Sequence, residues 1–450
     1  MDSAARFSFT EALLRFLHRS PTPFHAAAAA AEDLEKNGFC RLDESAAWRL
    51  ASGGKYYVRR DAGALAAFTL GTRPPEESGF RMIGAHTDSP CLKIRPAPDM
   101  NRHGTAQLGV EVYGGALLNP WFDRDLSIAG LVVIRTAAGE IRSLLLNFDR
   151  PLAVVPSLAI HLDREANQKR SINAQTDLLP VIATIMDGNS GAGSETGPAG
   201  RSGKDPDTLE SLVRRQLGEK YPDLEMAELL AHDLRLHDTA PARRIGLHRD
   251  FITGGRLDNL VSCFVAVAAL KRAAGKPPAM IILNDHEEVG SATISGAQGS
   301  FLSDLLARIL PSSEDRLRAI RRSFFWSVDA AHGLHPNFAA KSEDGHAPLL
   351  NCGPVLKLNA ARRYATEAEG AALFHRLCRS AGVPFQTFLM RNDMSCGSTI
   401  GPLTATRIGI RTLDIGVAMW GMHSIRETIG AEDPASLYET LAAFLREEEI

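Results

Sequence analysis

The stretch Pro278-Ala-Met-Ile-Ile-Leu-Asn-Asp-His-Glu-Glu-Val-Gly-Ser291 indicates the fold class of this chain. Its apolar run, from Met280 to Leu283, is short and ends at a cluster of acidic and amide side chains. A short apolar run of this kind is typical of a strand buried on both faces of a parallel sheet. Open α/β sheets place their functional sites at the carboxyl ends of such strands.

The neighbouring acids Glu287 and Glu288 allow two interpretations. A divalent metal would stabilise the pair, because one glutamate can ligate the ion while the other handles a proton. A solvated acidic turn explains this stretch equally well when it is taken alone. The rest of the chain has to decide between them.

Length and composition describe an ordinary globular protein. The 450 residues are 44% hydrophobic and 23% charged, which is enough for a large core and for two or three domains. The formal net charge of −3 gives no reason to expect nucleic acid or an anionic membrane as a partner. No apolar run reaches the roughly 18 residues of a membrane span. The first residues do not form a secretory signal, so we expect a cytoplasmic protein.

The cysteines restrict the kind of metal site. None forms a Cys-x-x-Cys pair, so we expect reduced thiols and no cysteine zinc cluster. Any metal must therefore be held by His, Asp and Glu. The six cysteines are Cys40, Cys91, Cys263, Cys352, Cys378 and Cys396.

A second strand, Phe80 to Gly84, runs into Ala85-His-Thr-Asp-Ser-Pro90. His86 and Asp88 lie on one side of extended backbone, which suits a metal-binding imidazole oriented by a carboxylate. A histidine at a strand end is by itself more often structural than a ligand.

Three further acidic or imidazole side chains lie next to the ends of expected strands or helices. Asp258 precedes a helix expected over 260–272, where capping the helix is the simpler explanation. Asp329 follows a strand over 324–328, and His423 follows strands within 407–419. Together with His86, Glu287 and Glu288, they supply ligands for two divalent ions about 3.5–4 Å apart, with one aspartate shared and one glutamate left to move a proton. Such ligands favour zinc, with manganese and cobalt as alternatives.

The pattern of apolar and polar residues changes between Lys93 and Leu179. Alternating apolar runs separated by Gly, Asn and Asp predict a β-rich module there. We therefore predict a discontinuous catalytic domain, 1–92 with 234–450, and an inserted domain, 93–233. Within the insert, 187–207 is rich in Gly, Ser and Pro and is expected to be a flexible surface loop. Residues 223–232 look helical, and His161 is by default a satisfied histidine in a strand.

The chain resembles the aspartyl aminopeptidase family of dinuclear zinc exopeptidases, as a bacterial member, in the family's order from Ser20 nearly to the end. The motifs that carry the resemblance are Gly84-Ala-His-Thr-Asp-Ser-Pro90, Trp121-Phe-Asp-Arg-Asp125, Arg256-Leu-Asp-Asn259, Asp285-His-Glu-Glu-Val-Gly-Ser291, His335-Pro-Asn337, Arg363-Tyr-Ala-Thr366, Cys396-Gly-Ser-Thr-Ile-Gly-Pro402 and Met422-His-Ser-Ile-Arg-Glu427. The resemblance implies a three-layer α/β/α zinc-peptidase domain with an inserted β-rich domain that is involved in oligomer contacts. It also implies cleavage of single residues from peptide N-termini, often Asp or Glu.

The resemblance further implies a role for each site residue. Asp258 would bridge two zinc ions, with His86 and Asp329 completing one site and Glu288 and His423 the other. Glu287 would be the general base, and Asp88 would orient His86. Lys357 would face the acidic side chain of the substrate. His161 would reach the active site of a neighbouring subunit, as a substrate-binding or metal-associated residue, within a tetrahedral dodecamer.

Departures and alternatives remain. Ser157 stands where relatives often carry His, Gly254-Gly255 precede Arg256 at a place where family members vary, and Trp420-Gly421-Met422 is an unusual lead into His423. A dinuclear deacylase or carboxypeptidase would use Lys357 as a clamp for a substrate carboxylate. A non-catalytic scaffold would have no use for Glu287. The run from Cys396 to Gly401 lacks the signature of a phosphate loop and reads as a turn that lines the site.

Overall fold

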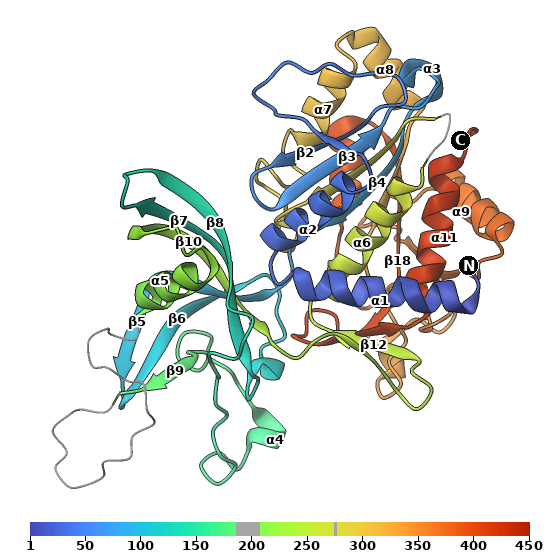
Figure 1. Ribbon diagram of the computed structural model, residues 1–450. Coiled ribbons are helices and arrows are strands. Elements are labelled where there is room, and N and C mark those ends of the chain that lie inside the picture. The colour runs from blue at the N-terminus through green and yellow to red at the C-terminus, as the bar shows by residue number, and fades with distance from the viewer. Residues whose placement is uncertain (186–207, 274–276) are drawn as a thin grey trace, which may run out of the picture. The chain divides into compact units, whose positions relative to one another are not determined.

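The computed structural model describes residues 1–185, 208–273 and 277–450, and it forms two compact units (Figure 1). Unit 1 contains Met1–Ser89 and Pro241–Ile450, and unit 2 contains Pro90–Ala240. The domain boundaries predicted from the sequence, 92/93 and 233/234, lie a few residues from these. The segment 187–207, predicted to be flexible, lies outside the described residues.

The main sheet of unit 1 has nine strands in the order β1-β2-β3-β13-β4-β14-β18-β16-β17. Its centre is parallel, since β13, β4, β14 and β18 all run the same way, while β3 and β16 are antiparallel to their central neighbours. The carboxyl ends of the parallel strands therefore meet at one edge. The strands are β1 Cys40–Arg41, β2 Lys55–Arg60, β3 Ala64–Thr69, β4 Arg81–His86, β13 Ala279–Asn284, β14 Phe324–Val328, β16 Val355–Leu358, β17 Gln386–Leu389 and β18 Arg411–Gly416.

Helices pack on both faces of this sheet (Figure 1). Strand β13 illustrates why: Ile281 and Leu283 join the core beneath α1, α2, α6, α9 and α11, whereas Met280 and Ile282 join the core beneath α7, α8 and α10. A strand buried on both sides needs an unbroken apolar run. The α/β prediction is thus confirmed. The helices are α1 Ser3–Arg19, α2 Pro23–Glu35, α3 Pro75–Ser78, α6 Leu257–Lys271, α7 Phe301–Ile309, α8 Ser313–Arg321, α9 Ala368–Ala381, α10 Ile400–Ile408 and α11 Asp433–Arg446.

A smaller sheet of unit 1 has the order β11-β12-β20-β19-β15. Its strands are β11 Arg243–Ile245, β12 Phe251–Gly254, β15 Ala331–His332, β19 Ala418–Trp420 and β20 Glu427–Gly430, and two short 3₁₀ turns elsewhere in the unit are η2 Glu287–Val289 and η3 Ala339–Lys341. The connection between β19 and β20 contains His423. This sheet therefore supports part of the candidate site.

Unit 2 is built on an antiparallel sheet in the order β8-β7-β10-β5-β6-β9. The β-rich character predicted for this region is visible in Figure 1. Its elements are β5 Cys91–Arg102, β6 Thr105–Tyr113, η1 Asn119–Trp121, β7 Leu126–Thr136, β8 Ile141–Asn147, α4 Ala166–Lys169, β9 Val181–Thr184, α5 Leu209–Lys220 and β10 Met226–Asp238.

Two predictions in unit 2 are wrong. The helix predicted over 223–232 is mostly strand β10, which pairs with β7 from Met226↔Thr136 to Asp238↔Leu126. Its Glu, Leu and Ala favour helix, but pairing with a distant strand overrides local propensity. His161 lies in an exposed turn instead of a strand, beyond the short bridges around Val154.

Local signals also misled at some element ends in unit 1. Helix α1 begins at Ser3, and the side chain of its N-cap residue Asp2 accepts a hydrogen bond from the Ala5 amide. Helices α8 and α10 and strand β20 were not predicted. Helix α10 starts at Ile400, within the run interpreted as a turn.

Candidate metal centre

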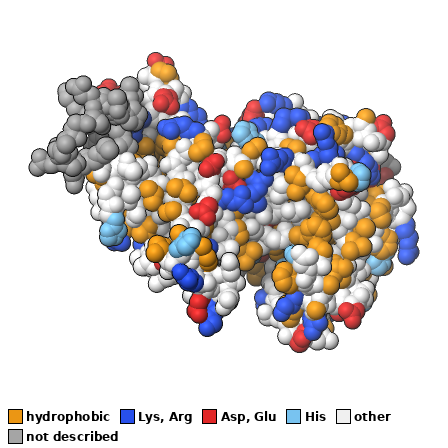
Figure 2. Space-filling model, turned by 90° about the horizontal axis from the view of Figure 1, so that it is seen from below, with side chains coloured by type: hydrophobic (Ala, Val, Ile, Leu, Met, Phe, Trp, Pro, Cys, Tyr) orange, Lys and Arg blue, Asp and Glu red, His pale blue; other side chains and the backbone are white. Residues whose placement is uncertain are grey.

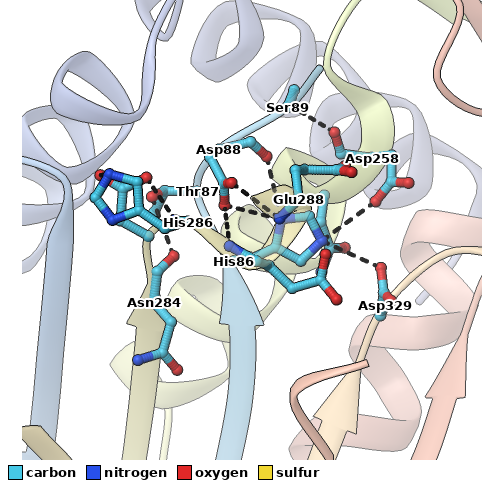
Figure 3. Close-up of polar contacts among 12 residues, drawn as sticks. His86, Thr87, Asp88, Ser89, Asp258, Asn284, His286, Glu288 and Asp329 are labelled. Atoms are coloured by element: carbon cyan, nitrogen blue, oxygen red, sulfur yellow. Dashed lines mark hydrogen bonds and ion pairs between the residues drawn. The ribbon is translucent and has the colours of Figure 1, made fainter. Parts of the chain in front are cut away.

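The candidate site lies where three neighbouring strands of the main sheet end. His86 is the last residue of β4, Asp329 follows β14 directly, and Glu287 and Glu288 form the 3₁₀ turn after β13 (Figure 3). Register explains the convergence, because β13 and β14 both run parallel to β4 and Asn284 lies opposite His86. Parallel strands thus bring His86 and Asp329, which are about 240 positions apart in the sequence, to one edge of the sheet.

Asp258 lies between two imidazoles. Its Oδ1 is 3.5 Å from His86 Nε2, and its Oδ2 is 3.7 Å from His423 Nε2. Each oxygen therefore faces a different histidine. A carboxylate in this arrangement can bridge two cations, one beside each imidazole.

A further acid lies beside each imidazole. Asp329 Oδ1 is 3.4 Å from His86 Nε2, and Glu288 Oε2 is 3.3 Å from His423 Nε2. Within the described residues, three groups have potential ligand atoms within 4.8 Å of one another: His86, Asp258 and Asp329; Asp258, Glu288 and His423; and His86, Glu287 and Glu288.

The donor set fits divalent cations. Asp258 Oδ1 and Glu288 Oε1 are buried and have no hydrogen-bond partner. Buried carboxylate oxygens without partners are costly unless a cation neutralises them. Nitrogen and oxygen ligands of this kind suit zinc.

The acids also crowd one another electrostatically. Burial raises the pKa of Glu287 to about 8, with His86 opposing and the nearby aspartates adding to the rise. Burial and the charge of Asp258 raise the pKa of Glu288 well above its usual range. Burial alone would lower the pKa of His86, but Asp258, Asp329 and Asp88 together raise it well above its ordinary value. A bound dication would relieve this repulsion.

Asp88 contacts two parts of the site. Its Oδ1 lies 3.4 Å from His86 Nδ1, and its carbonyl oxygen lies 3.1 Å from the same nitrogen. Its carboxylate also accepts hydrogen bonds from the Glu287 and Glu288 amides, both at 3.1 Å. The side chain predicted to orient His86 is thus in position to do so, and it also holds the turn that carries both glutamates (Figure 3).

Lys357 has partners within the chain. It is 1% exposed, and its Nζ lies 3.5 Å from Asp329 Oδ2 and 3.1 Å from the Ala330 carbonyl oxygen. The ammonium also lies over the ring of Tyr364 at 5.1 Å. Burial opposes ionisation of Asp329, but Lys357 and His86 hold its pKa well below its usual range. The burial of this lysine therefore does not require a substrate carboxylate.

His161 is the predicted site residue that the structure does not bring to this cluster. It belongs to unit 2, its side chain is exposed, and none of the ligand groups found among the described residues contains it.

Sequence reasoning missed Glu427. This side chain is 2% exposed and accepts hydrogen bonds from the backbone amides of Asp258 and His423. It ends the quoted motif Met422-His-Ser-Ile-Arg-Glu427, so the signal was present, but the motif alone does not say what the acid contacts.

The fold and this cluster define a metallohydrolase of the α/β type. A family model described as "Aminopeptidase I zinc metalloprotease (M18)" matches residues 16–445. The chain belongs to the M18 family, and it is therefore a metallo-aminopeptidase that acts on peptides.

Relatives with similar sequences are named as members of the same family. The chain is 48% identical over 439 residues to "Probable M18 family aminopeptidase 2" of Azotobacter vinelandii, covering 98% of each chain. It is also 48% identical over 445 residues to the protein of that name from Stutzerimonas stutzeri, covering 99% of this chain and all of the relative.

Solved structures agree. The protein in "Cryo-EM structure of the Ape4 and Nbr1 complex" is 36% identical with a TM-score of 0.91, covering 98% of this chain and 86% of that one. The "Structure of S. cerevesiae mApe1 dodecamer" is 28% identical with a TM-score of 0.81, covering 97% and 95%. Among the described residues of the present chain, no helix has the length and apolarity to cross a bilayer.

Proposed function

We propose that this chain is a two-metal aminopeptidase that removes single N-terminal residues, preferentially Asp and Glu, from peptides. The proposal is supported mainly by the position of the Asp258 carboxylate, whose two oxygens each face a different imidazole. A single-metal site would not need this arrangement.

The residues present would hold two zinc ions. His86 and Asp329 would ligate one ion, Glu288 and His423 the other, and Asp258 both. Zinc bound there would polarise the scissile carbonyl and make a water easier to deprotonate. Manganese or cobalt would fit the same ligands.

Glu287 is proposed as the general base. It belongs to the group with His86 and Glu288, and it is not needed as a ligand in this assignment. Its carboxylate would take a proton from the attacking water, whose oxygen bonds to the carbonyl carbon. The same proton would pass to the leaving amine as the C–N bond breaks.

The preference for acidic residues is assigned to Lys357. A buried ammonium beside the site would attract the side-chain carboxylate of an N-terminal Asp or Glu. Because Lys357 also contacts Asp329, a substitution there is expected to slow all substrates. The ratio between an acidic and an apolar substrate isolates the specificity.

The test of the reaction and of its specificity uses Glu-, Leu- and N-acetyl-Glu-terminated forms of one peptide. We expect release of free Glu from the first, slower release of Leu, and none from the acetylated form. In Lys357→Met the Glu/Leu ratio of kcat/KM should fall roughly 10- to 100-fold, the value of a lost charged contact. Cleavage of the acetylated peptide, or release from the carboxyl end, would favour the deacylase or carboxypeptidase. An unchanged ratio would reject the role of Lys357.

We also propose that the protein is a cytoplasmic homo-oligomer, with His161 acting in the site of a neighbouring subunit. His161 lies among exposed apolar side chains, with Leu158 61%, Ile160 45% and Leu162 75% exposed. Apolar side chains also gather in patches on the face drawn in Figure 2, which supports burial against further copies. Six free cysteines suit a reducing compartment. Native mass spectrometry should find a dodecamer, and a monomer active at nanomolar concentration would contradict this.

A further inference from the structure

Glu427 is a buried acid that none of the roles above uses. It is the first residue of β20 and is paired in the ladder with Gly254 of β12, so its backbone is fixed by the small sheet. Its side chain is directed at two other segments. Oε2 accepts a hydrogen bond from the Asp258 amide at 3.0 Å, and Oε1 accepts one from the His423 amide at 2.8 Å.

Both contacts are made to residues that carry candidate ligands. Asp258 lies in the first turn of α6, and His423 lies in the connection between β19 and β20. These segments are 165 positions apart (423 − 258) and share this one carboxylate. This carboxylate therefore links the two backbones, whose side-chain atoms Asp258 Oδ2 and His423 Nε2 lie 3.7 Å apart.

The backbone at His423 needs such support. Its φ of 67° is in the left-handed region, which residues other than glycine rarely adopt unless the surroundings hold them there. The hydrogen bond from its amide to Glu427 provides that restraint. A carboxylate is suited to the task because each oxygen accepts one amide, whereas a glutamine would direct an NH₂ group at one of two N–H donors.

We propose that Glu427 is a positioning residue that holds Asp258 and His423 at the spacing required to bind the second cation, the one assigned to Asp258, Glu288 and His423. This inference rests on the proposed two-metal function. Glu427 touches neither the substrate nor an ion in this assignment, and it acts through the backbones of two ligands.

Asp433 offers a matched control in the same part of the chain. It is 0% exposed, and its two oxygens accept the amides of Asn351 and Gly353 at 2.8 and 3.0 Å. Asp433→Asn therefore removes the same kind of buried double acceptor as Glu427→Gln. Its partners are not candidate ligands, so a general loss of stability is separated from a specific loss of metal.

The experiment measures zinc bound per subunit in the full-length protein, by elemental analysis after dialysis, and the affinity of each site by competition with a chromophoric chelator. Wild type and Asp433→Asn should hold two zinc ions. Glu427→Gln should keep one tightly and bind the second on the order of 10- to 100-fold more weakly, the range seen when the groups that orient ligands are removed.

Each outcome decides something. Two tight ions in Glu427→Gln would overturn the inference and leave the proposed function intact, as would equal metal loss in both variants. Fewer than two ions in wild type would instead count against the two-metal function. If Glu427→Gln does not fold, Glu427→Asp keeps both acceptors on a shorter arm and should weaken the second site; wild-type affinity there would also overturn the inference.

Discussion

The two halves of the candidate centre are held in different ways. In one half the side chains of His86 and Asp329 are 2% and 14% exposed; His86 is the last residue of the central strand β4, and Asp329 follows the central strand β14. In the other half Glu288 lies in a 3₁₀ turn and His423, 32% exposed, lies in a loop. Strand ends position ligands through the sheet, while the turn and the loop depend on carboxylates behind them, Asp88 and Glu427.

This comparison predicts that the two proposed cations differ in binding affinity. The strand half is dry and already ordered, so little freedom is lost when an ion binds. The loop half is more exposed and must be held in shape. We therefore expect a tight ion beside His86 and a more exchangeable one beside His423.

The largest expected effect concerns the residue that belongs to neither half. Glu287→Gln should reduce kcat by roughly 10² to 10⁴, because it removes the proposed general base while leaving the assigned ligands in place. Turnover of a Glu-terminated peptide and zinc content are measured together. Glu367→Gln, at a surface acid with a side chain 69% exposed, serves as the control. Turnover equal to that of wild type would show that another group is the base.

The second effect tests the difference between the halves directly. During timed exposure to EDTA, wild type should release zinc in two phases, with the fast phase from the loop half. His423→Ala should lack the fast phase and His86→Ala the slow one, because each loses the ion beside its own imidazole. The rates are expected to differ by about tenfold or more. A single phase in wild type would remove the distinction.

The smallest effect is a pH dependence of stability in the metal-free protein. The pKa of Glu287 is raised from 4.5 to about 8 in the folded state. The folded protein therefore holds a proton that the unfolded chain has lost between these values, and stability falls as the pH rises through that window. In Glu287→Gln the decrease in Tm across this pH window should be smaller than in wild type by about a few degrees. Asp433, with a pKa raised to about 7, contributes equally to both proteins. Identical slopes would mean that Glu287 is not buried as a neutral acid.

Much of the fold could be predicted from local pattern. The short apolar strands 280–283 and 324–328 were recognised because strands buried on both faces are nearly continuous apolar runs, and the α/β class followed. Strand β10 was not recognised. Its residues favour helix, but they are held as a strand by pairing with β7, which is distant in sequence. Family membership was also predicted from the motifs and is confirmed by the match over residues 16–445.

The site divides in the same way. The sequence by itself determined which chemical groups lie at the ends of the strands, because it specifies every residue type. It also predicted that these groups meet, because parallel strands bring their carboxyl ends to one edge of the sheet. Only the tertiary structure decided that Asp258 faces two imidazoles, that Lys357 contacts Asp329, and that Glu427 joins Asp258 to His423. Such contacts depend on distances of a few ångströms between segments far apart in sequence, and those distances are set by packing, which no local pattern records.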